Sequence, residues 1–128
     1  MDADGQGAQR RKRAQGVKAD KLQDALVELD PTLGRWADEY VFGEVWAEDA
    51  LPFEERMLVA IAALAAQNRT HQLRNYLHGA LQDGIPEAKL REVMKMMTVY
   101  AGFPVAIEAM SELDGVLAAR SGSGSANR

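Results

Sequence analysis

The stretch Leu73–Pro104, LRNYLHGALQDGIPEAKLREVMKMMTVYAGFP, decides the fold of this 128-residue chain. It contains two amphipathic helical patterns, each closed by residues that stop a helix. Gly84 follows the first pattern as a C-terminal cap, and Pro86 starts the second. Gly102 ends the second pattern, and Pro104 follows it. The stretch therefore predicts two consecutive helices with a sharp break between them.

The same helical reading extends over the rest of the chain. Asp30 and Pro31 form a strong helix start, an N-cap acceptor followed by proline at the first helical position. No alternating apolar run bounded by hairpin turns is present, so strands are not expected. The sequence predicts an all-α fold of about six helices. Three have both ends predicted, at about 9 to 29, 31 to about 46, and 71 to 83; the other three are predicted to begin at 52, at 86 and after 104. The aromatic residues of the second helix, Trp36, Tyr40 and Phe42, predict heavy burial there.

The two ends of the chain are polar and rich in glycine, serine or both. We expect residues 1–8 and 121–128 to be disordered tails and residues 9–120 to form one domain. No apolar run is long enough to span a bilayer, and the first residues lack the apolar stretch of a secretory signal. A cytoplasmic protein without a membrane partner is expected.

Composition excludes several classes of function. The chain has no cysteine and two histidines, which argues against thiol chemistry and against a metal site within one chain. Its net charge is −4, and residues after 20 are strongly acidic, so nucleic acid is not an expected partner. The basic run Arg10–Arg13 is interpreted as a solvated helix start or an arm on an acidic neighbouring subunit.

The helix from His71 to Asp83 carries the most polar chemistry. His71, Arg74, Asn75 and His78 share one face, whereas Tyr76 lies on the apolar face, nearly opposite His78. The polar stripe is either a site or a solvated or subunit-facing surface. Arg56 either pairs with local acids or projects into a cleft as an anion anchor, and Glu44 is either a desolvated acid or a surface carboxylate. The Ala- and Met-rich helices are too apolar for a small isolated bundle, which predicts oligomerisation.

Several short motifs in order resemble the carboxymuconolactone decarboxylase family, within the alkyl-hydroperoxidase D-like superfamily. They are Phe42–Trp46 (FGEVW), Arg56 followed by Leu58–Ala66 (LVAIAALAA), Gly79-Ala80-Leu81 with Gly84, and Tyr100–Pro104 (YAGFP). The resemblance covers roughly Leu29–Leu117. It implies an all-helical alkyl-hydroperoxidase D-like fold assembled as a ring-like homohexamer of trimer or dimer units. It implies neither a metal nor an organic cofactor.

The reaction for which the family is named removes CO2 from 4-carboxymuconolactone. The bonding electrons flow into the conjugated lactone carbonyl, so the protein need only desolvate the carboxylate, stabilise charge on oxygen and deliver a proton to carbon. The resemblance therefore implies a small carboxylic acid or lactone as substrate, including a polyketide-type acid. The candidate catalytic residues are Tyr76, His78, Glu44 and Arg56; the candidate substrate-binding residues are Arg74, Trp46, Tyr100 and Phe103.

The chain departs from the family at informative positions. The Glu, Cys-x-x-Cys and His relay of the peroxidase branch is replaced by Met57, Arg69, Gln72 and Tyr76, which excludes thiol peroxidase activity. The decarboxylases usually keep a histidine where this chain has Tyr76, so it is a diverged member. Two hypotheses follow: a cofactor-free decarboxylase-like enzyme, or a non-catalytic oligomeric member that binds a ligand or partner through the same pocket.

Overall fold

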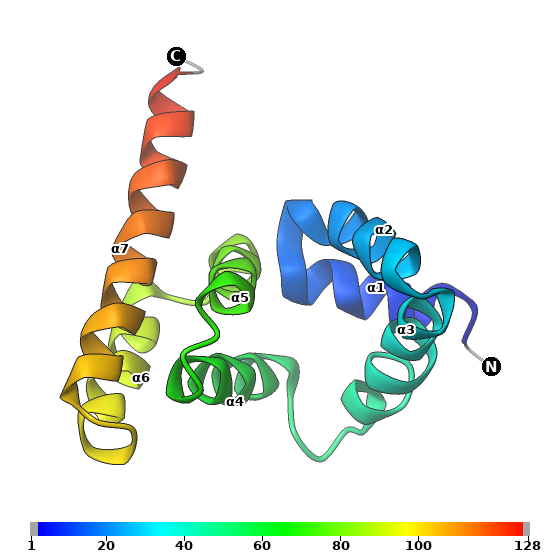
Figure 1. Cartoon of the computed structure of the whole chain (residues 1–128), viewed down its shortest axis with the longest axis horizontal. Helices are drawn as coiled ribbons and strands as arrows, with labels where there is room; N and C mark the ends of the chain where they lie inside the picture. Colours follow the sequence, from blue (N-terminus) through cyan, green and yellow to red (C-terminus); the bar gives the residue numbers. More distant parts are fainter. Residues whose placement is uncertain (1–2, 127–128) are drawn as a thin grey trace.

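The computed structural model describes the chain from Ala3 to Ala126, with side chains described from Gly5 to Gly122, and every regular element in it is helical (Figure 1). The all-α prediction is therefore confirmed. In chain order the α-helices are α1 (Ala3–Gln15), α2 (Ala19–Leu29), α3 (Pro31–Trp36), α4 (Phe53–Ala66), α5 (Thr70–Gln82), α6 (Glu87–Tyr100) and α7 (Phe103–Ala126). Three short turns complete the chain: 3-10 turns at Gly16–Lys18 and Val45–Ala47 and a π-helical turn at Ala37–Val41.

The helix boundaries follow the local chemistry that the sequence predicts. The Asp30 carboxylate accepts the N–H of Thr32 at 2.8 Å, ahead of Pro31 at the first helical position. Gly84 and Gly102 end α5 and α6 with φ of +94° and +103°, a left-handed conformation that favours glycine. The predicted breaks are confirmed at these positions.

Two of the predicted helices are interrupted. The first is divided at Gly16, whose φ of +73° turns the chain between α1 and α2. In the second, the N–H of Phe42 donates to the carbonyl of Ala37 five residues back, which widens the helix into a π turn. Phe42 is buried, but Trp36 and Tyr40 are more than half exposed. The prediction of heavy burial is wrong for these two aromatics. Helix α3, which ends at Trp36, packs on α2, and the π turn that contains Tyr40 packs on α1; both rings stay at the surface.

Both terminal helices extend into the segments expected to be tails, and the disorder of those segments stays a prediction. Helix α1 already begins at Ala3, and α7 continues to Ala126. Gly7 explains part of this, because it packs directly on the backbone of Asp38. Residues 1, 2, 127 and 128 lie outside the described residues.

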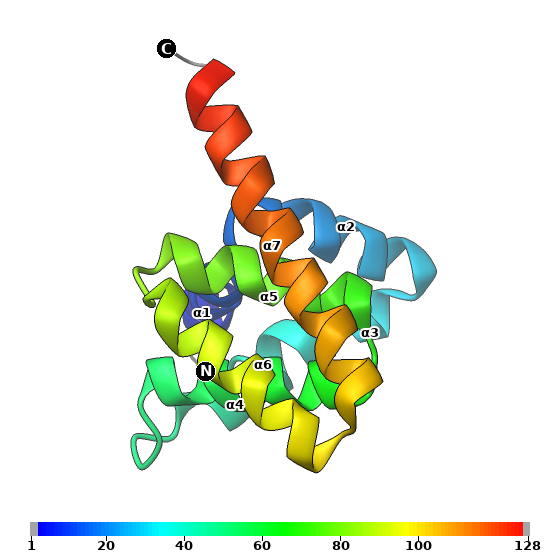
Figure 2. The same ribbon diagram turned by 90° about the vertical axis from the view of Figure 1, so that its left-hand side faces the viewer.

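Helix α5 occupies the middle of the molecule, between α1 on one side and the α6–α7 pair on the other (Figure 1). The buried cluster is built mainly from α4, α5, α6 and α7, with Leu73 and Leu77 of α5 fully buried in it. The C-terminal part of α7 extends beyond the other helices (Figure 2). No helix in the described part is long and apolar enough to cross a membrane.

The basic run of α1 fixes that helix to the rest of the chain. Arg11 is buried; its Nε donates to the Asp38 carboxylate at 2.6 Å, and its Nη1 donates to the Ala19 carbonyl at 2.9 Å. Arg13 forms two hydrogen bonds, of 2.6 and 3.1 Å, with Asp83 at the end of α5. The interpretation as a solvated start or an intersubunit arm is therefore wrong for Arg11 and Arg13, which pair within the chain.

Candidate active site

A cleft of about 600 Å³ lies between α2, α4 and α5. Its surface is mostly apolar, and its polar groups come from α5 and from the end of α1. We call it the Tyr76 cleft. It is lined by Gln15, Leu22, Ala25, Leu26, Leu29, Trp46, Ala60, Ala63, Leu64, His71, Gln72, Asn75 and Tyr76.

Tyr76 is the candidate catalytic residue that the cleft contains. Burial raises the pKa of its hydroxyl above the usual 10, while a hydrogen bond from the Gln15 side chain acts in the opposite direction. The ring centroid of Trp46 lies 6.5 Å from that of Tyr76. It also lies 5.1 Å from the Phe42 centroid and 5.7 Å from the Phe53 centroid, with the rings tilted against one another. Tyr76 is thus a neutral hydrogen-bond donor beside an aromatic wall.

The other polar side chains of α5 in the cleft are His71, Gln72 and Asn75. Together with Tyr76 they fall at i, i+1, i+4 and i+5, which places them on one side of the helix. Asn75 is buried, with 6% of its surface exposed, whereas His71 and Gln72 lie exposed at the rim. None of the residues that line the cleft is a lysine, arginine, aspartate or glutamate. A ligand would therefore meet neutral hydrogen-bonding groups, with His71 as the single titratable rim residue apart from Tyr76.

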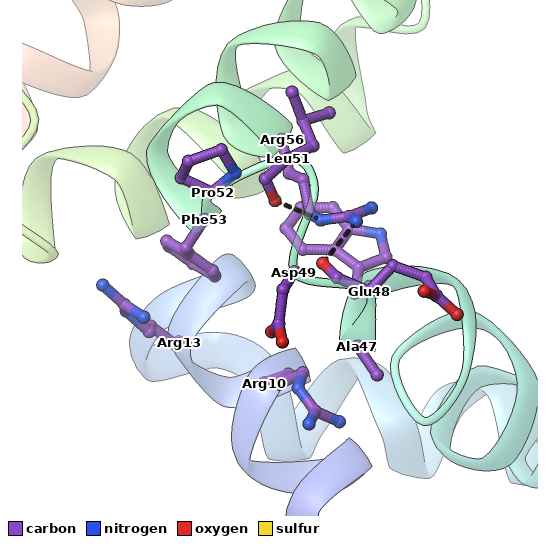
Figure 3. Close-up of a pocket in the computed structure, with 10 residues that line it drawn as sticks. Arg10, Arg13, Ala47, Glu48, Asp49, Leu51, Pro52, Phe53 and Arg56 are labelled. Atoms are coloured by element: carbon purple, nitrogen blue, oxygen red, sulfur yellow. Dashed lines mark hydrogen bonds between the residues drawn. The ribbon is translucent and has the colours of Figure 1, made fainter.

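Arg56 lies outside this cleft. Its guanidinium donates to three backbone carbonyls, those of Leu51 at 2.8 Å, Val45 at 2.9 Å and Glu48 at 2.7 Å. Figure 3 shows the side chain reaching across the loop that these carbonyls belong to. Neither reading of Arg56 from the sequence describes this arrangement: the side chain holds the loop before α4 rather than an acid or a substrate.

The pocket drawn in Figure 3 is a smaller hollow of about 210 Å³ next to Arg56. Arg10 and Arg13 lie on its α1 side, and the Asp49 side chain points between them. Both arginines have structural partners: Arg10 donates to the Phe42 carbonyl at 2.9 Å, and Arg13 lies 3.7 Å from the ring centroid of Phe53. Trp46 lines this hollow and the Tyr76 cleft alike.

Arg74 and His78 are on a different side of α5 from the cleft. Arg74 pairs with Glu112 of α7 at 2.8 Å. His78 is half-buried, and its pKa is lowered by burial and by the positive charges of Lys18, Arg120 and Arg74. The structure does not bring His78 to Tyr76 in one cleft.

The remaining candidate residues are also away from the cleft. Glu44 is exposed, which matches its reading as a surface carboxylate. Tyr100 and Phe103, at the turn between α6 and α7, are 75% and 63% exposed. Of the eight candidate residues, Tyr76 and Trp46 line the cleft, and the other six do not.

Sequence reasoning missed Gln15 and Gln72, and it named His71 and Asn75 as members of a polar stripe but not among the candidate site residues. Placing Tyr76 on the apolar face of the helix separated it from that stripe. Gln15 belongs to a distant helix, and no local pattern predicts that it approaches α5. Within the described residues no group of three or more histidine, aspartate or glutamate side chains is placed to hold a metal ion.

Comparison with known proteins identifies the family of the chain. Residues 31–114 match the profile of the carboxymuconolactone decarboxylase family. The chain belongs to this family. The matched region includes α4, α5 and α6, and with them most of the lining of the Tyr76 cleft.

Two relatives carry decarboxylase names. The chain is 30% identical to a 4-carboxymuconolactone decarboxylase of Acinetobacter baylyi over 106 residues, 82% of this chain and 79% of the relative. It is 32% identical to a nitrosuccinic acid decarboxylase of Metarhizium robertsii over 72 residues, 56% of this chain and 50% of that relative. These similarities support a decarboxylase-like family at modest identity.

Proposed function

We propose that the protein is a cofactor-free decarboxylase-like enzyme that acts on a small or polyketide-type carboxylic acid or lactone in the Tyr76 cleft. The observation that carries the proposal is Tyr76 itself, a neutral hydroxyl set beside Trp46 in a mostly apolar cleft. The decarboxylase names of two relatives support the same reaction class. Their named substrates, one a lactone and the other an open-chain acid, leave the substrate of this chain open.

The cleft suits loss of CO2 because it removes the carboxylate from water without giving it a cationic partner. Desolvation raises the free energy of the charged carboxylate more than that of a transition state whose charge is spread out. The carbon–carbon bond then breaks, its electron pair moves into the conjugated carbonyl, and CO2 leaves. Tyr76 delivers a proton to carbon, and the tyrosinate regains a proton from water. A raised pKa keeps the Tyr76 hydroxyl protonated and ready to donate at neutral pH.

The test is turnover of 4-carboxymuconolactone and of nitrosuccinic acid, followed as CO2 release, by the wild type and by Tyr76→Phe. Removal of a general acid lowers kcat by about 10²–10⁴-fold. Tyr40→Phe removes the same hydroxyl from an exposed position in the π turn, outside the cleft, and should leave kcat unchanged. Full activity in Tyr76→Phe would contradict the proposed role.

We propose further that copies of the chain assemble, as a hexamer or trimer, through the apolar surface around the α6–α7 turn. Val99, Tyr100, Phe103 and Ile107 are each more than half exposed there, and Met96 adjoins them. A contiguous apolar surface of this kind favours association. Val99→Glu should lower the mass measured by light scattering, whereas Val17→Glu, at an equally exposed site on the Gly16–Lys18 turn, should not.

The alternative is a non-catalytic member that binds a ligand in the same cleft. One observation favours it: of the four candidate catalytic residues, the cleft contains Tyr76 and not the other three. Saturable ligand binding without CO2 release from any carboxylic acid tested would support this alternative.

A further inference from the structure

The Tyr76 cleft is lined by an asparagine whose amide the rest of the described chain does not engage. Asn75 is 6% exposed, and its side chain forms no hydrogen bond with any residue in the described part of the chain. It precedes Tyr76 on α5, and both side chains line the cleft. More than nine-tenths of its surface is therefore buried, but the amide is not among the enclosed side-chain atoms without a partner, so the exposed remainder includes the amide, which opens to the cleft.

An amide that lines a mostly apolar cleft and makes no hydrogen bond within the protein is available to a polar group of a ligand. Leucine has the same number and branching of side-chain heavy atoms as asparagine and would suit the apolar lining around it, such as Leu26 and Leu64. A second unpartnered group lies in the same cleft: Oε1 of Gln15 is buried and has no hydrogen-bond partner in the structure. The Asn75 amide and the Gln15 oxygen, both without a hydrogen-bond partner in one mostly apolar cleft, point to a bound molecule that carries hydrogen-bonding groups.

We propose that Asn75 is a substrate-binding residue whose amide N–H donates to a carbonyl oxygen of the ligand. This inference rests on the proposed function and names the part of the substrate that the cleft recognises. The recognised class is an enolisable carbonyl compound, such as an unsaturated lactone. Its carbonyl oxygen is the atom that gains negative charge when CO2 leaves.

A neutral donor fits this role better than a cation would. Asparagine and tyrosine donors can stabilise an oxyanion in a mostly apolar cleft, and such donors act most strongly on the charge that develops in the transition state. An arginine at the same place would also hold the carboxylate of the ground state, which slows its departure. With Asn75 on the carbonyl oxygen, Tyr76 remains free to protonate carbon.

The experiment measures binding of 2(5H)-furanone, an unsaturated lactone that has no carboxylate and cannot be decarboxylated. Trp46 reports on the cleft by fluorescence, in a Trp36→Phe background that removes the other, exposed tryptophan. The variants are Asn75→Leu and Asn75→Asp. Gln82→Leu is the matched control, because it makes the same type of change at an exposed position of α5 outside the cleft.

Asn75→Leu should weaken furanone binding by about tenfold or more, and its Tm should change little, because the amide makes no hydrogen bond within the protein. Asn75→Asp should lose binding at pH 7.5, where the new carboxylate cannot donate. It should regain binding as the pH is lowered and the carboxyl becomes a donor. A residue with a merely structural role would not show this recovery.

Three results would overturn the inference. The first is a Tm for Asn75→Leu more than about 5 °C below that of the wild type, which would make the amide a structural group. The second is unchanged furanone affinity in both Asn75 variants, and the third is no furanone binding by the wild type. If the wild type binds furanone through Asn75 but releases no CO2 from any acid, the proposed decarboxylation fails and the Asn75 site stands.

Discussion

The contact between α1 and α5 gives the sharpest test of the packing that forms the cleft. A Cβ atom added at Gly79 would lie 1.8 Å from the carbonyl oxygen of Ala14 and 2.5 Å from its carbonyl carbon. Ordinary contact begins at 3.4 Å, so Gly79→Ala must push α1 away by more than an ångström. The obstructing atoms are backbone and cannot rotate aside. We expect a steric cost near the upper end of the range for overpacking, about 3 kcal/mol. The better helix propensity of alanine offsets about 1 kcal/mol of this.

The net loss is about 2 kcal/mol, which lowers Tm by about 8 °C for a chain of this length. Gly115→Ala is the control: it lies in α7, is exposed, and its added Cβ would meet no atom within 4 Å. There propensity acts alone, and Tm should rise by about 2–4 °C. Differential scanning calorimetry of both variants decides the matter. Equal Tm values for the two variants, or a rise in both, would refute the close approach of α1 to α5.

Three further predictions follow from the surroundings of charged or titratable side chains outside the cleft. His78 has a folded-state pKa below its ordinary 6.5, so the unfolded chain binds the His78 proton more readily than the folded chain. The contribution of His78 to stability is therefore full above pH 6.5 and falls as the pH drops below it. In urea unfolding, His78→Gln should lose less stability than the wild type between pH 7.5 and pH 5. Arg11→Met leaves the partly buried Asp38 carboxylate without its partner and should lower the free energy of unfolding by about 2 kcal/mol in the same urea assay. Lys12→Met is the control: Lys12 pairs with Asp20 at 3.8 Å in an exposed position, so its loss should change the free energy of unfolding little. Arg56→Lys cannot keep all three hydrogen bonds to carbonyls, so amide hydrogen exchange over residues 45–52 should speed up; unchanged exchange there would show that Arg56 does not hold this loop.

The sequence predicted those parts of the fold that local chemistry determines. Asp30-Pro31, Gly84 and Gly102 set helix ends through caps and backbone conformation, and each acts at the position read from the sequence. The π turn at Ala37–Val41 was not predictable in this way, because it depends on the approach of α1 to Asp38. The cleft was predictable only in part for the same reason. Tyr76 and Trp46 come from motifs, whereas Gln15 joins them through packing between α1 and α5.

The arginines show why residue type alone did not predict how the cleft treats a carboxylate. Arg56 and Arg74, the two candidates for holding a carboxylate, are bound to three backbone carbonyls and to Glu112. For either to hold a substrate, these contacts would first have to break, and each hydrogen bond of a charged group contributes about 1.5–3 kcal/mol. A cleft whose lining includes no lysine or arginine is then consistent with the reaction, because an ion pair would stabilise the carboxylate that has to leave. On this reasoning an Arg introduced at Gln72, on the rim of the cleft, should tighten the binding of a carboxylate product analogue while lowering kcat. A rise in kcat together with tighter binding would mean that charge pairing, rather than desolvation, drives the step.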